Sequence, residues 1–172
     1  MIPLVPIIFF FIILISTGHS DDLSLKKSLT FYASFDNGTN AEIAKGDKQL
    51  YTLINKKSKL GNHTEGMTKL VTGQGLSGDA LLFSKRNANW LFYDGDKNFN
   101  FDVKDWSGSV SFWIKVDPIN KLDPGYVDPI QITPNTWNDA SFFVDFDKEG
   151  SPRPFRLGAF ADKAVWLSLI HI

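Results

Sequence analysis

Residues 107–118 read SGSVSFWIKVDP, an alternating stretch that decides the fold class. Apolar side chains stand at every second position of it, namely Val110, Phe112, Ile114 and Val116. Successive side chains of a β-strand point to opposite faces, so a period of two predicts a strand with one buried face. Trp113 falls on the polar face, where it is either a second core contact or a ring that faces a ligand.

Six further stretches have strand character: 29–36, 79–84, 89–94, 128–133, 139–147 and 154–160. Turn residues separate these stretches about every ten positions, including Gly, Pro, Asn and Asp. We expect no helix beyond a turn or two near 41–45. We interpret residues 46–72 as a long surface excursion of the chain, that is, a loop that contains an irregular strand. Short strands separated by such turns predict an all-β fold, an antiparallel β-sandwich or jelly roll.

Three motifs follow one another in the order FYASFD (31–36), GQGLSGDALLF (73–83) and WSGSVSFWIKVDP (106–118). This succession resembles the concanavalin A-like lectin/glucanase superfamily, and most closely its LamG-like jelly-roll domains. The resemblance covers most of residues 29–117. It implies the jelly-roll fold but no particular activity, because jelly-roll domains serve many roles.

The first twenty residues are typical of a secretory signal peptide. The apolar run from Ile2 to Ile15 is shorter than a membrane span of about 20 residues, and small residues at Gly18 and Ser20 suit a cleavage site. We therefore predict a signal peptide over 1–20, a jelly-roll domain over 21–172, and a secreted, periplasmic or cell-surface location with no membrane span in the mature chain. An uncleaved anchor is the alternative, since this segment lacks Lys and Arg.

The resemblance also predicts that the domain is incomplete at its C-terminus. LamG-like domains continue with a W-x-H-x-x-x-T strand and an aromatic-x-Asp-Gly turn, and neither occurs before Ile172. A jelly roll without its last strands exposes sheet edges and apolar faces. We therefore expect residues 21–172 alone to be aggregation-prone or partly unfolded.

Composition excludes several classes of function. The 172 residues include no Cys, so disulfides, a cysteine nucleophile and thiolate metal sites are excluded. The net charge of −1 offers no basic field for nucleic acid. The G-x-G-x-x-G pattern of Gly73, Gly75 and Gly78 precedes a strand rather than a helix, so we interpret it as a tight turn and not as a dinucleotide site.

Catalytic residues are not apparent, so we expect a non-enzyme. Glycosidases of this fold need two carboxylates across the scissile bond, and the three Glu residues are far apart in the sequence. Asp145 and Asp147 share one strand face but form a weak substitute, because Asp147 lies at a turn. The three His residues stand in the leader, a loop and the tail.

Calcium is the one cofactor that the residues indicate. The stretch DGDKNFNFDVKD (94–105) carries oxygen ligands at alternating positions, among them Asp94, Asp96 and Asn98. Phe99 stands where an EF-hand has Gly, so an EF-hand is disfavoured, and an ordinary strand is the alternative. The resemblance adds Asp36, because many LamG-like domains bind calcium near a sheet rim.

A candidate ligand-binding face follows from strand parity. Trp113, Phe143, Asp145 and Arg156 all fall opposite the apolar faces of their strands. Aromatic rings beside charged groups suit sugars, which present apolar C–H faces and polar rims. Loops packed over this face are the alternative.

We therefore predict a non-catalytic module that binds carbohydrate or another extracellular ligand. The second choice is a structural or protein-interaction domain of a larger surface protein, and the third is a glycoside hydrolase.

Overall fold

The computed structural model describes residues 21–54, 57–60, 68–85, 89–100, 102, 106–133, 142–162 and 165–171. The predicted signal peptide lies outside these residues. One helix and eleven strands are described: α1 (Asp21–Ser28), β1 (Phe31–Tyr32), β2 (Ile43–Ala44), β3 (Leu50–Ile54), β4 (Lys57–Leu60), β5 (Thr68–Val71), β6 (Ala80–Phe83), β7 (Trp90–Tyr93), β8 (Val127–Ile132), β9 (Phe142–Phe146), β10 (Phe155–Asp162) and β11 (Val165–His171).

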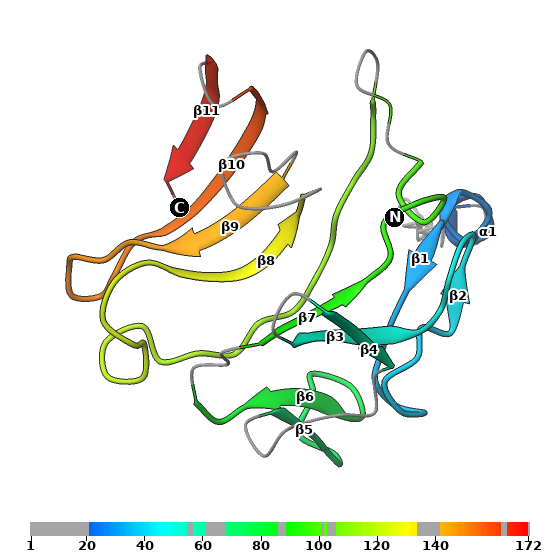
Figure 1. The fold of residues 1–172 in the computed structure, drawn as a ribbon, viewed down its shortest axis with the longest axis horizontal. Helices are drawn as coiled ribbons and strands as arrows, with labels where there is room; N and C mark the ends of the chain where they lie inside the picture. Colours follow the sequence, from blue (N-terminus) through cyan, green and yellow to red (C-terminus); the bar gives the residue numbers. More distant parts are fainter. Residues whose placement is uncertain are drawn as a thin grey trace, which may run out of the picture.

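The strands form four small antiparallel sheets. Their orders are β11-β10-β9-β8, β4-β3-β7, β1-β2 and β5-β6. Figure 1 shows the four-stranded sheet on one side of the molecule and the three smaller sheets grouped on the other, with α1 beside β1 and β2. The described part of the chain is therefore mostly β and antiparallel, as its turn-separated strands predict.

Strand β9 carries the best buried part of the core. Val144 is fully buried and Phe146 nearly so, on the face that the alternation of β9 predicts to be apolar. Antiparallel pairing sets Phe155 of β10 opposite Phe146, and their ring centroids lie 5.0 Å apart. Each buried side chain of this size contributes about 1.5–3 kcal/mol through removal of apolar surface from water. The parity predicted for the apolar faces of β9 and β10 is confirmed, because Phe155 pairs with Phe146 and Leu157 with Val144.

A second cluster forms where β3 meets β7. Leu50 and Thr52 are buried on one face of β3, and the ring of Tyr93 packs edge-on against Phe31 at 4.8 Å. The interpretation of residues 46–72 as a surface excursion was wrong, because β3, β4 and β5 all fall within it. Buried Thr52 explains the error, since a polar residue on the inner face hides the apolar alternation.

The stretch that decides the fold class forms no strand itself. Residues 106–117 are outside every sheet, Trp113 is 81% exposed, and Val110, Ile114 and Val116 are also exposed. The prediction that Val110 and Ile114 belong to the core was therefore wrong. Alternation gives a segment one apolar face, but a strand also needs a neighbour for its backbone, and no described strand pairs with this segment.

Two local predictions have opposite outcomes. The predicted helical turn at 41–45 was wrong, because Ile43 and Ala44 pair with β1, and the helix lies at α1 instead. The tight turn at GQGLSG is confirmed, because it joins the antiparallel strands β5 and β6. Gly73 and Gly78 adopt φ values of +67° and +83°, in the left-handed region that glycine adopts more readily than residues with a Cβ.

Candidate ligand-binding site

A charged cluster lies on the four-stranded sheet, on the face opposite Val144 and Phe146. Asp145 and Asp147 stand two residues apart, and β10 places Arg156 directly opposite Asp145. Arg156 donates from Nε to Asp145 Oδ1 at 2.8 Å and from Nη2 to Asp145 Oδ2, and from Nη1 to Asp147 Oδ2 at 3.1 Å. One guanidinium thus binds both carboxylates in a fixed fork geometry.

Burial makes this ion pair structurally important. The side chains of Arg156 and Asp145 are 13% and 5% exposed, while that of Asp147 reaches the surface more fully. The hydrogen bond to Asp145 raises the pKa of Arg156, against the opposing effect of desolvation, and the charges of both aspartates add to the rise. The guanidinium therefore stays charged and held in one orientation.

Tyr126 extends the cluster to the surface. The guanidinium carbon of Arg156 lies 4.9 Å from the centroid of the Tyr126 ring, a cation–π contact. Tyr126 as a whole residue is 52% exposed, so its side chain contacts the guanidinium and still reaches solvent. Tyr126 is thus an aromatic platform whose support is itself fixed by two carboxylates.

A bulge in β8 sets Tyr126 and Asp128 on this face. Val127 pairs with Phe146 and Ile130 with Val144, so two residues of β8 stand opposite one residue of β9. Proline lacks a backbone N–H, and Pro129 occupies the bulge, where no ladder bond is lost. Desolvation, followed by the charge of Asp145, raises the pKa of the neighbouring Asp128, and Arg156 opposes the rise.

Phe143 lies on the same face of β9 as Asp145, but it is too buried to face a ligand. It is buried, and its ring lies over Gly158 of β10, where an added Cβ would collide with the ring. The sheet therefore brings together three of the four predicted ligand-binding residues, Phe143, Asp145 and Arg156. Two of these, Phe143 and Asp145, are too buried to present a surface to a ligand. Asp145 instead orients Arg156, and Phe143 packs against Gly158 of the neighbouring strand.

Trp113 is the fourth predicted residue, and no described contact joins it to the cluster. It lies on the unpaired segment 106–117. Tyr126 was missed by sequence reasoning. The signal that could have found it is the alternation of Tyr126 and Asp128 around Val127, which gives both residues the parity of Asp145 once β8 is aligned with β9.

The predicted calcium ligands fall into two places. Asp36 accepts from the backbone N–H of Asp79 at the β5–β6 turn. Asp94, Asp96 and Asn98 lie together after β7, where Asp94 accepts from the Asp96 backbone N–H. Among the described residues, no group of three or more acidic, His or Cys side chains is close enough to hold a metal ion.

Asn98 is a structural brace in this second place. Its side chain is fully buried, accepts from the Gly46 N–H at 2.7 Å and donates to the carbonyls of Asp47 and Asp94, each at 2.7 Å. Its amide oxygen therefore already has a protein donor. Calcium binding remains a prediction, either at Asp36 or at Asp94 and Asp96, because the structure places these residues in two separate places.

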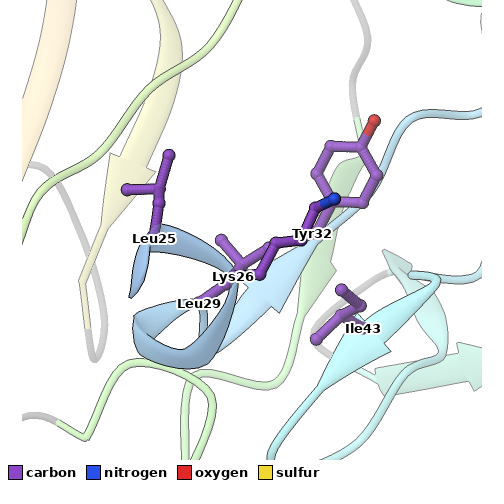
Figure 2. Close-up of a pocket in the computed structure, with 5 residues that line it drawn as sticks. All are labelled: Leu25, Lys26, Leu29, Tyr32 and Ile43. Atoms are coloured by element: carbon purple, nitrogen blue, oxygen red, sulfur yellow. The ribbon is translucent and has the colours of Figure 1, made fainter. Parts of the chain in front are cut away.

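A separate apolar hollow lies between α1, β1 and β2. Figure 2 shows its five lining residues, and the hollow measures about 510 Å³ and is open to solvent. The residues that line it are Leu25, Lys26, Leu29, Tyr32 and Ile43. It lacks the converging polar groups that orient a ligand, so the Arg156 cluster is the better candidate site.

Comparisons with known proteins do not identify the chain. No family model matches it, and neither the curated proteins nor the solved structures contain a significant match. Over the described residues, no helix has the length and apolar character needed to cross a membrane.

Proposed function

We propose that this chain is an exported, non-catalytic module of the jelly-roll class that binds carbohydrate at the Tyr126–Arg156 cluster. The observation that carries the proposal is the half-exposed Tyr126 ring stacked on a guanidinium that two aspartates hold. A ring fixed in this way loses little conformational freedom on binding, which favours affinity.

The chemistry of the cluster matches the surface of a sugar. The exposed part of Tyr126 can cover an apolar C–H face, while Asp147 and Asp128 offer acceptors for hydroxyl groups at its rim. Trp113, exposed on its own segment, is a second ring of the same kind. Predicted export places such a module where extracellular glycans occur.

A structural or protein-interaction domain is the second candidate. The exposure of the apolar segment 107–117 favours it, because large exposed apolar patches are typical of interaction surfaces.

A glycoside hydrolase is the third candidate function. Asp145 and Asp147 both bind one guanidinium, whereas hydrolytic carboxylates stand about 5–9.5 Å apart across the scissile bond with oxygens directed at the substrate.

A glycan array tests the proposal. The whole chain should bind a defined set of glycans, Tyr126→Ala should lose that signal, and Tyr126→Phe should keep it, because Phe retains the ring. Trp113→Ala tests the second ring independently. Silence across the array, with a folded protein, contradicts carbohydrate binding and favours the interaction domain. Turnover of a polysaccharide that Asp145→Asn abolishes would favour the hydrolase.

A further inference from the structure

Residues 107–117 are held by hydrogen bonds at both ends, and no described strand pairs with them between these ends. Trp106 donates from its indole Nε1 to the carbonyl of Phe99 at 2.8 Å, and the carbonyl of Pro118 accepts from the Arg153 N–H. Within the described part of the chain, no backbone hydrogen bond involves residues 107–116. Toward the rest of the described chain, this segment of strand-like alternation therefore has unpaired backbone donors and acceptors.

We propose that this segment pairs with the same segment of a second copy of the chain. Antiparallel strands related by a two-fold axis through Trp113 set Phe112 opposite Ile114 and Val110 opposite Val116. On the other face, Ser111 stands opposite Lys115 and Ser109 opposite Asp117. Every apolar residue of the predicted core face then meets an apolar residue of the second copy.

Charge and symmetry favour this occupant. The two charges of the segment, Lys115 and Asp117, each face a serine in this register, so no like charges meet. The register overlaps nine residues, 109–117, which lie between the two anchored ends. A two-fold contact is self-complementary, so the paired edge closes at the dimer. The ladder satisfies the backbone groups of the alternate residues Val110, Phe112, Ile114 and Val116.

The pairing explains the solvent exposure that the single chain shows. Trp113 is 81% exposed and Ile114 is 42% exposed, and both would lose exposed area to the second copy. The Trp113 rings of the two copies would face each other at a position without ladder hydrogen bonds, where side chains of opposite strands come closest. This inference does not depend on the Tyr126–Arg156 cluster of the proposed carbohydrate site. It does assign Trp113 to the dimer contact, so Trp113 would not be a free second ring for a sugar in the dimer.

Cysteine cross-linking tests the register directly, because the chain has no Cys of its own. Ser111→Cys and Lys115→Cys are prepared separately in the full chain, mixed and oxidised mildly. In the dimer these two positions face each other within disulfide reach, whereas each position lies about 13–15 Å from its own equivalent. The mixture should cross-link at least about tenfold faster than either variant alone.

Ile114→Pro supplies the second measurement. Proline at a position that donates a ladder bond should abolish the cross-link of the mixture, while Ile114→Val should retain it. Ile114 lies outside every described strand, so neither substitution should change the melting temperature of the dilute monomer. Equal rates in the mixture and in the single variants, or no cross-link in the mixture, would overturn the proposal. A cross-link that survives Ile114→Pro would overturn it as well.

Discussion

Arg156 lies directly across from Asp145 on the neighbouring strand and binds its carboxylate through two nitrogens, Nε at 2.8 Å and Nη2. Both side chains are largely removed from solvent. A buried ion pair of this kind costs a large desolvation penalty, which its mutual attraction offsets only while both partners are present. The pair therefore fixes the geometry of β9 and β10 more than it adds net stability.

Removal of one partner should be strongly destabilising. Arg156→Met leaves the Asp145 carboxylate buried without a counter-charge, and we expect a loss of about 3–5 kcal/mol in the free energy of unfolding, measured in urea. The double variant Arg156→Met/Asp145→Leu should recover most of that loss, because both charges are gone. A double variant as unstable as the single one would contradict this account of the pair.

The core face of β9 should be sensitive to truncation. Phe146 is buried against Phe155, so Phe146→Ala should lower the free energy of unfolding by about 3–5 kcal/mol. Phe83 offers a matched control, because it is 53% exposed, and Phe83→Ala should change stability by less than about 0.5 kcal/mol. Similar losses for both variants would show that Phe146 is not a core residue.

Gly158 should not tolerate a side chain while Phe143 is present. An added Cβ would collide with the Phe143 ring, so Gly158→Ala should cost about 1–3 kcal/mol through overpacking. In the double variant Phe143→Leu/Gly158→Ala, the smaller side chain makes room for the Cβ. Its cost, measured by thermal unfolding, should be less than the sum of the two single costs. Additive costs would contradict the contact.

Substitution of Asn98 tests whether its side chain is a structural brace or a calcium ligand. Asn98→Asp replaces an amide that donates to two carbonyls with a carboxylate that repels them, so we expect a loss of about 1–3 kcal/mol for each unpaired carbonyl. Asn100→Asp, at an exposed neighbour, should stay within about 0.5 kcal/mol. If Asn98 were a calcium ligand, Asn98→Asp would instead raise stability in the presence of Ca²⁺.

Glu42 should make stability depend on acid pH. Desolvation acts to raise the pKa of Glu42, but the Ser34 hydroxyl and backbone N–H, at 2.6 and 2.9 Å, together hold it below the ordinary value of 4.5. A carboxyl whose pKa is lower in the folded state stabilises the fold above its unfolded pKa. That stabilising contribution is lost as pH falls below 4.5, the ordinary pKa, and through the lower pKa of Glu42 in the folded state.

Ser34→Ala tests this dependence. The variant should be less stable than the native chain by less than about 1 kcal/mol at neutral pH, because Glu42 is close to solvent. The difference between the two should shrink as pH falls below 4.5, in thermal melts across that range. Ser109→Ala, at an exposed position, serves as the control. A difference that stays constant down to low pH would show that the hydrogen bonds do not act on Glu42.

Alternation predicted the paired strands well where the neighbouring strands are close in sequence. Strands β6, β7 and β9 fall within predicted stretches, while β8 begins one residue before its stretch and β10 ends two residues after its stretch. The parity of β9 and β10 also predicted that Asp145 and Arg156 share a face. Odd or even position predicts the face of the sheet on which a side chain lies, because a shift of one residue in register would move every side chain to the opposite face.

Long-range pairing was the part that the sequence could not supply. Nothing in the alternation of 107–117 says whether a neighbouring strand is available, and no described strand pairs with this segment. The inner-face Thr52 concealed β3, and the bulge at Pro129 concealed the place of Tyr126. Each miss concerns a partner or a register that depends on distant residues rather than on local pattern.

An NMR titration tests the central claim most directly, namely that Tyr126 and Arg156 form the ligand-binding site. The glycan with the strongest array signal is added to the ¹⁵N-labelled chain, and the Arg156 side-chain Nε–H and the Tyr126 amide signals are followed. We expect both to shift in a saturable manner in the native chain, and neither the shifts nor the binding to persist in Tyr126→Ala. Saturable glycan binding that leaves both signals unchanged would contradict the claim.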